Sequence, residues 1–179
     1  MDFGRLLQEA WDRFVAELVP LVLFALLGTL LCFTIVLIPT VTAGWVRGIL
    51  AYLRNGDVPA FDELWSFDDY FPVALMLLLG FAGVTIGYML LFVPGVILNT
   101  WWLYALYFLL DRNLGVVEAF AASRDAVSRT GFFNHLVVLL ILSVLAAIGG
   151  LLSGLGTVFT TPFSLVFLTL VYLDLTSST

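Results

Sequence analysis

The sequence predicts an all-α integral membrane protein with six transmembrane helices in three hairpins. The chain of 179 residues is 62% hydrophobic and only 11% charged, whereas a soluble domain is about one quarter charged. Three long runs, Leu18–Val46, Tyr70–Leu110 and Thr130–Leu173, contain no charged side chain. One helix needs about 20 apolar residues to cross a bilayer, so each run is long enough to cross at least once. We expect residues 1–179 to form a single transmembrane bundle.

A break near the middle of each run predicts a hairpin instead of one long helix. The second run has 41 residues, and a helix of that length would measure about 60 Å, roughly twice the thickness of the hydrocarbon core. We interpret Pro39, Pro94 and Gly95 as hinges, because proline and glycine interrupt helices, and the glycine-rich stretch 149–156 as the third break. The second span is the weakest, because it is short and contains Arg47. The predicted spans are 18–38, 40–54, 72–93, 95–110, 133–153 and 157–174.

Amphipathic segments precede the three hairpins and are expected to lie in the plane of the cytoplasmic interface. The first covers residues 2–18, the second follows Pro59 and the third begins near Val116. Each segment opens a module, and similar motifs recur at intervals of 54 and 55 residues. Duplication and a fixed bilayer thickness both explain such spacing, so the two explanations stay open. The modules cover about 1–56, 57–113 and 114–179. The helical apolar positions of the first segment are Phe3, Leu6, Leu7, Ala10, Trp11, Phe14 and Leu18.

The arginines predict the orientation in the membrane. All seven cationic residues are arginines, and they lie near the N-terminus, in the 47–57 region or in the 111–131 segment. With six spans, these segments all fall on one side. Because cytoplasmic loops are enriched in positive charge, we expect both termini in the cytoplasm, and the protein in the cell membrane of a prokaryote.

Composition also excludes several kinds of function. A net charge of −6 without any lysine argues against a nucleic-acid partner and against a polybasic lipid-binding patch. The single Cys32 and the single His135 leave no set of zinc ligands. The sequence contains no metalloprotease, phosphate-loop or redox motif. We therefore expect no enzyme and no cofactor. The expected partners are membrane lipids, with other membrane subunits or a second copy as further candidates.

Arg47 is the most informative single residue, because a charge within a membrane span is costly and usually has a partner or a function. Glu17, Asp111 and Asp174 lie at similar depths near the ends of other predicted spans. One hypothesis is that Arg47 pairs with one of these three carboxylates. The alternatives are that its side chain extends to the headgroups or lines a transport pathway.

Other polar residues have a structural and a functional interpretation. Asn99 is an amide in the interior of a predicted span; it bonds to a carbonyl freed by Pro94 or to a neighbouring helix or, alternatively, contacts a ligand. His135 begins the fifth span and is expected at the water boundary. The acidic residues at 62, 63, 68 and 69 are expected to form a solvated loop, with a divalent cation as the alternative.

Pairs of glycines four residues apart occur once in each hairpin. Such pairs allow two helices to approach closely. We expect them to mediate packing within the bundle, with self-association as the alternative. The pairs are Gly44 and Gly48, Gly83 and Gly87, and Gly150 and Gly154.

Several short motifs along most of the chain resemble those of a known group. They are Ala10-Trp11, Gly44, Arg54-Asn55-Gly56 with Phe61 and Leu64, Val93-Pro94-Gly95-Val96-Ile97, Asp111, Glu118-Ala119 with Ser123, and Pro162-Phe163 with Tyr172. With these motifs the chain resembles a family of small, mostly uncharacterised bacterial and archaeal multi-span membrane proteins. That family also occurs as the membrane domain of some glycerophosphodiester phosphodiesterases. The resemblance implies a six-helix bundle. It implies no catalytic residue here, because the phosphodiesterase activity belongs to a separate soluble domain.

Two functions are consistent with the sequence. The first is a non-enzymatic membrane component, either an accessory or scaffold subunit or a lipid-associated homo-oligomer, because the spans carry few polar residues. The second is a small-molecule or ion transporter or channel, which Arg47 and the interrupted spans favour. The second function requires a polar path through the bundle.

Overall fold

The computed structural model describes residues 3–31, 35–56, 58–151 and 156–177. The described residues form helices and turns and contain no strand, which confirms the all-α prediction. The elements are α1 (Phe3–Ala16), α2 (Leu18–Leu31), η1 (Ile35–Leu37), α3 (Ile38–Asn55), η2 (Phe61–Trp65), α4 (Tyr70–Leu90), α5 (Phe92–Trp101), α6 (Ala105–Arg112), α7 (Val116–Thr130), α8 (Phe132–Leu151) and α9 (Thr157–Ser177).

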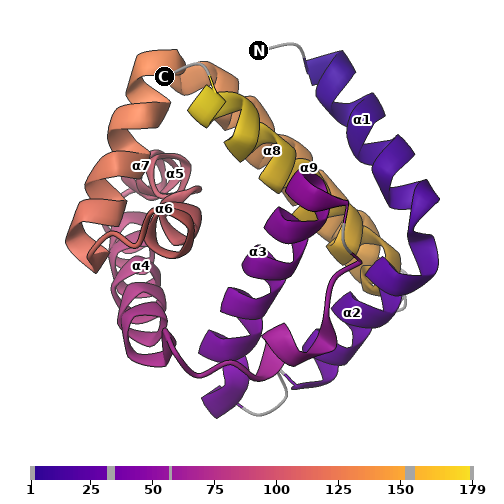
Figure 1. The fold of residues 1–179 in the computed structure, drawn as a ribbon. Coiled ribbons are helices and arrows are strands. Elements are labelled where there is room, and N and C mark those ends of the chain that lie inside the picture. Colours follow the sequence, from indigo (N-terminus) through magenta and orange to yellow (C-terminus); the bar gives the residue numbers. More distant parts are fainter. Residues whose placement is uncertain (1–2, 32–34, 57, 152–155, 178–179) are drawn as a thin grey trace.

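Helix α9 lies at the centre of the arrangement. It contacts α1, α2, α3 and α8, which come from both ends of the sequence. In Figure 1, α4 to α7 gather on the left, and α1 and α2 lie on the right. The inner face of α9 carries fully buried apolar side chains, including Val166, Phe167 and Val171. The main core therefore forms around this helix.

Four stretches of the described residues are long and apolar enough to cross a membrane. They are α4, the α5–α6 stretch Phe92–Arg112, α8 and α9. Helices α4 and α8 are mostly uncovered by the rest of the chain, and side chains such as Phe71, Met89 and Leu151 are more than 80% exposed. Apolar surfaces of this extent are typical of contact with lipid or with another protein. The four helices are thus compatible with an integral membrane protein.

The first hairpin differs from the prediction. Helix α2 has 14 described residues, fewer than the about 20 that one crossing needs, and residues 32–34 after it lie outside the described part of the chain. Helix α3 contains two arginines and is the less apolar of the pair. Pro39 does not break a helix; it lies in the first turn of α3, where its missing N–H has no helical partner to lose. The six-span arrangement in three hairpins remains a prediction.

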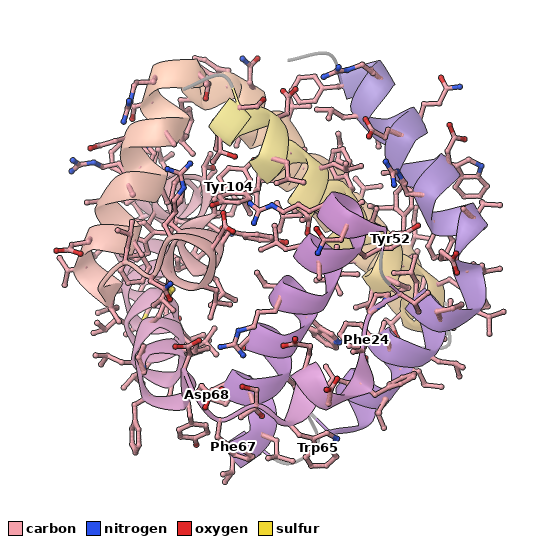
Figure 2. The ribbon with its side chains drawn as sticks, in the orientation of Figure 1. Phe24, Tyr52, Trp65, Phe67, Asp68 and Tyr104 are labelled. Carbon is pink, nitrogen blue, oxygen red and sulfur yellow. The ribbon has the colours of Figure 1, made fainter. Side chains whose placement is uncertain are left out.

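The segment after α3 returns along that helix. The predicted amphipathic helix is a five-residue 3-10 helix, η2, and Leu64 packs with Phe24 and Val41 in a small second core. A Cβ atom on Gly44 would lie 2.5 Å from the carbonyl oxygen of Glu63. Figure 2 shows Trp65, Phe67 and Asp68 beside the start of α3. Gly44 is about 15 Å along α3 from Arg54. The acidic segment around Glu63 therefore lies beside the middle of α3 and not beyond its C-terminal end.

Helix α1 packs lengthwise against α9, and its position in the plane of the interface stays a prediction. Arg5 donates to Asp174 at 2.8 Å near one end. At the other end, the rings of Trp11 and Phe14 lie 6.3 and 5.9 Å from that of Phe163. The apolar stripe that the sequence predicted is the face that contacts the core, where Leu6, Ala10 and Phe14 are buried.

Most of the predicted glycines do mediate close packing. A Cβ atom would lie 2.7 Å from the ring of Phe24 at Gly48, 2.6 Å from Trp102 at Gly83 and 2.9 Å from Gly95 at Gly87. Gly150 is an exception, because no atom lies within 4 Å of its Cβ position. The neighbouring Gly149 contacts α9 instead. Gly154 lies outside the described residues.

The hairpin between α4 and α5 turns at Leu91, whose backbone is extended. Pro94 follows in the first turn of α5. Gly95 lies against the ring of Tyr88, with its Cβ position 2.5 Å away. The predicted hinge residues therefore start the second helix and allow close packing, and the bend itself precedes them.

We expect Gly95→Leu to destabilise the protein by about 1–3 kcal/mol, because the added side chain must displace Tyr88 from a packed hairpin. Thermal unfolding in detergent micelles measures this effect. Gly150→Leu is the control, since it adds the same side chain to open space in α8. Equal losses of stability in the two variants would contradict the packing role.

Candidate functional site

The carboxylate of Asp111 joins three helices. Arg54 on α3 donates to its two oxygens at 2.5 and 2.9 Å, and Tyr172 on α9 donates its hydroxyl at 2.8 Å. The Asp111 side chain is only 11% exposed. A bidentate arginine–carboxylate pair fixes both distance and orientation. This cluster therefore determines how the ends of α3 and α6 meet α9.

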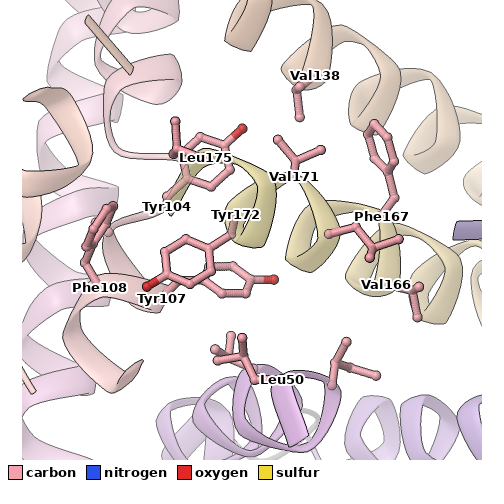
Figure 3. Packing of buried hydrophobic residues seen from close by; sticks show 14 of the residues in the cluster. Leu50, Tyr104, Tyr107, Phe108, Val138, Val166, Phe167, Val171, Tyr172 and Leu175 are labelled. Carbon is pink, nitrogen blue, oxygen red and sulfur yellow. The ribbon is translucent and has the colours of Figure 1, made fainter. Parts of the chain in front are cut away.

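Aromatic packing continues this cluster into the core. The ring of Tyr172 stacks on Tyr107 with centroids 5.0 Å apart, as Figure 3 shows. The hydroxyl groups of Tyr107 and Thr169 lie 3.0 Å apart, and Thr169 donates to the carbonyl of Leu165. Tyr107 must therefore be the donor to Thr169. The hydroxyl groups of Tyr172, Tyr107 and Thr169 thus each have a partner.

Arg47 has a carboxylate partner, but not one of the three expected. It pairs with Asp69, the residue that precedes α4. Asp111 is taken by Arg54 and Asp174 contacts Arg5. The structure describes no ion pair from Glu17 to any other described residue. The error arose because the sequence does not reveal that the segment before α4 returns to the middle of α3.

The surroundings of Arg47 are polar and acidic. Together with Asp62, Glu63, Ser66, Asp68 and Asp69 it lines an opening of about 350 Å³. Among the described residues, no group of three potential ligands is close enough to hold a metal ion.

His135 does not lie at the water boundary as predicted; it is completely buried. Its Nδ1 lies 3.0 Å from the hydroxyl of Tyr104, and its Nε2 lies 2.6 Å from the hydroxyl of Thr130. Thr130 donates to the carbonyl of Ala126, so it accepts from Nε2–H. Nδ1 then accepts from Tyr104. We assign a neutral imidazole on this pattern of donors and acceptors.

A break between α5 and α6 lies next to this histidine. Ser123 on α7 accepts from the N–H of Tyr104 at 3.2 Å and donates to the carbonyl of Trp101 at 2.7 Å. One hydroxyl group thus satisfies both sides of the break, as buried backbone groups require. We gave Ser123 no structural role from the sequence. Its position on the stripe that includes Ala119 and Ala126, all of it buried, is the signal that could have revealed it.

Asn99 lies at a groove between α4 and α5–α6. The groove has a volume of about 510 Å³ and is lined mainly by apolar residues, among them Phe81, Trp102 and Phe120. The side chain of Asn99 is half-buried and makes no hydrogen bond to another described residue. It does not contribute the interhelical hydrogen bond that the sequence suggested.

Comparison with protein-family models, with curated proteins and with solved structures finds no match to this chain. The resemblance to the membrane domain of some phosphodiesterases therefore remains a prediction. The interpretation of the site rests on the geometry alone.

We expect Asp111→Asn to lower the free energy of unfolding by about 1–3 kcal/mol, because Arg54 and Tyr172 lose a shared ionic acceptor. Chemical unfolding in detergent measures the loss. The control is Asp125→Asn, whose partner Arg124 is adjacent and exposed; a surface pair of this kind contributes about 0–1 kcal/mol. A loss in Asp125→Asn as large as in Asp111→Asn would refute the special role of the cluster.

We expect Ser123→Ala to lower the free energy of unfolding by about 1–3 kcal/mol, because the buried N–H of Tyr104 loses its acceptor and the half-buried carbonyl of Trp101 loses a donor. Hydrogen–deuterium exchange should also become faster at Tyr104, the residue whose amide loses its acceptor. Ser128→Ala on the exposed side of α7 is the control. Unchanged exchange at Tyr104 would show that Ser123 does not stabilise the break.

Proposed function

We propose that the chain is a non-enzymatic integral membrane protein that acts as an accessory or scaffold subunit, or as a homo-oligomer surrounded by lipid. The observation that carries this proposal is the large apolar surface of α4 and α8. In each of these helices only 17% of the most apolar 18-residue window is buried within the chain. The proportion for α9 is 44%.

The exposed side chains form continuous faces and not isolated positions. On α4 they include Leu78, Phe81 and Met89, and on α8 they include Leu140 and Val144. A lipid environment accommodates such faces, and a second membrane helix packs on them through van der Waals contacts. The proposal assigns them to lipid and to partner subunits.

The buried polar groups support a structural role over a transport path. Thr40, Thr100 and Thr169 each donate to a carbonyl three or four residues earlier in the chain. Ser123 and His135 have the partners given above. Hydrogen bonds of this kind stabilise helices and breaks. Each of these five groups therefore has at least one hydrogen-bond partner within the protein.

A transporter is the second candidate, and one observation favours it. The broken α5–α6 helix lies beside a buried histidine, and broken helices and ionisable groups within membranes are characteristic of transport sites. Under this function, His135 and Tyr104 would carry a proton.

The proposal also includes the topology. The ion pair between Arg54 and Asp111 and the pair between Arg5 and Asp174 support a single charged side for the ends of α3, α6 and α9 and the start of α1. Placement of that side and both termini in the cytoplasm of a prokaryote is part of the proposal, as is a six-span arrangement in which α2 and α3 form the first hairpin.

Gentle extraction from native membranes followed by native mass spectrometry tests the proposal. We expect a discrete assembly heavier than the 19.7 kDa of one chain, because the faces of α4 and α8 bind partner subunits. A second arm measures proton flux in liposomes that contain the purified protein and a pH-sensitive dye, with His135→Gln as the matched variant. A monomer that conducts protons, and loses this activity in His135→Gln, would establish the transporter instead.

A further inference from the structure

The ends of α6, α7 and α9 surround a pocket that the proposed function does not use. Its volume is about 500 Å³. Two of its lining residues, Arg112 and Arg129, come from the last turns of α6 and α7. Thr176, near the end of α9, also lines the pocket, and its hydroxyl donates to the carbonyl of Tyr172. The remaining wall is apolar and includes Phe108 and Leu175.

The charge in this pocket is opposite to that of the whole chain. The net charge is −6, yet no carboxylate lines the pocket. Arg5, Arg47, Arg54 and Arg124 each pair with an aspartate. For Arg112 and Arg129, by contrast, no ion pair to any described carboxylate is found. Arg112 lies within electrostatic range of the Asp111 carboxylate but forms no direct ion pair with it, so two arginines line one open space from which the described carboxylates are absent.

The interaction of each arginine with the end of its own helix does not explain why both arginines line one pocket. A cation in the last turn stabilises the negative end of a helix, and both arginines fulfil that role. The same role would be fulfilled by side chains directed apart into solvent. Here two arginines, a threonine and an apolar wall instead line a single space large enough for a small molecule.

We propose that this pocket binds a phosphate-bearing anion. The planar guanidinium group presents a fork of N–H donors that matches two phosphate oxygens. The pocket also lies where the candidate spans Phe92–Arg112 and Thr157–Ser177 end, which is the depth of lipid headgroups. The apolar wall suits the glycerol and the first methylenes of a phospholipid. The site does not depend on the scaffold role proposed above.

Titration of the detergent-solubilised full chain with short-chain phosphatidylglycerol, followed by native mass spectrometry, tests the site. We expect Arg112→Gln and Arg129→Gln each to weaken binding about tenfold, as expected when one charge-assisted contact is lost. Arg124→Gln is the matched control, because it removes the same charge from α7 outside the pocket. We expect its affinity to stay within about twofold of wild type.

Inorganic phosphate as a competitor distinguishes the source of the anion. Displacement of the lipid by inorganic phosphate supports a soluble phosphate compound as the ligand, and retention of the lipid supports a phospholipid headgroup. Failure of the wild type to bind either probe overturns the proposal. An equal loss in Arg124→Gln also overturns it, since general charge would then explain the binding.

A second measurement needs no variant and so does not depend on the folding of one. Hydrogen–deuterium exchange of the wild type with and without phosphatidylglycerol should show protection at residues 112–114, 126–129 and 175–176. Protection elsewhere, with none in these three stretches, overturns the proposal.

Discussion

The fold depends on one carboxylate, that of Asp111, whose side chain is only 11% exposed. Asp111 receives a bidentate arginine from α3 and a hydroxyl from α9, so one side chain connects three parts of the sequence. In lipid, apolar side chains do little to select which helices pair, because an apolar helix face packs on another helix much as it packs on acyl chains. Polar contacts between helices therefore select the arrangement. The same reasoning applies to Ser123 and His135, which connect α7 and α8 to the break between α5 and α6.

Two hydroxyl groups of this molecule each make two hydrogen bonds. Ser123 serves a donor and an acceptor at once, and Thr130 donates to a carbonyl while it accepts from an imidazole. A buried hydroxyl group has one proton and two lone pairs, so it can complete two broken hydrogen bonds in a space that excludes water. This property explains how a chain with so few polar residues tolerates an interrupted helix in its interior.

Hydropathy was sufficient to predict α4, α5–α6, α8 and α9, because each is a long apolar stretch and the bilayer fixes the required length. It was also sufficient for the buried stripe of α1.

Hydropathy failed for the segment around η2, where the direction of the chain depends on a contact between Gly44 and a backbone carbonyl that no periodicity encodes. The partner of Arg47 was wrong for the same reason. His135 was placed at the surface because its position in the sequence lies at the start of a span. Its burial depends on Tyr104 and Thr130, which become neighbours only through the tertiary fold. The pocket at the ends of α6, α7 and α9 escaped notice because net charge averages over the whole chain and does not reveal that Arg112 and Arg129 line one space.

The packing of α1 on α9 has a consequence for biosynthesis. Arg5 and its partner Asp174 are separated by 169 positions. At about 5–20 residues per second, a ribosome needs on the order of 10–30 s to make the intervening chain. The apolar stripe of α1 therefore lacks its final neighbour, α9, during most of translation. An amphipathic helix in that state adsorbs to the bilayer surface. The predicted position at the interface therefore suits α1 before α9 is made, whereas the contacts with α9 describe the finished molecule.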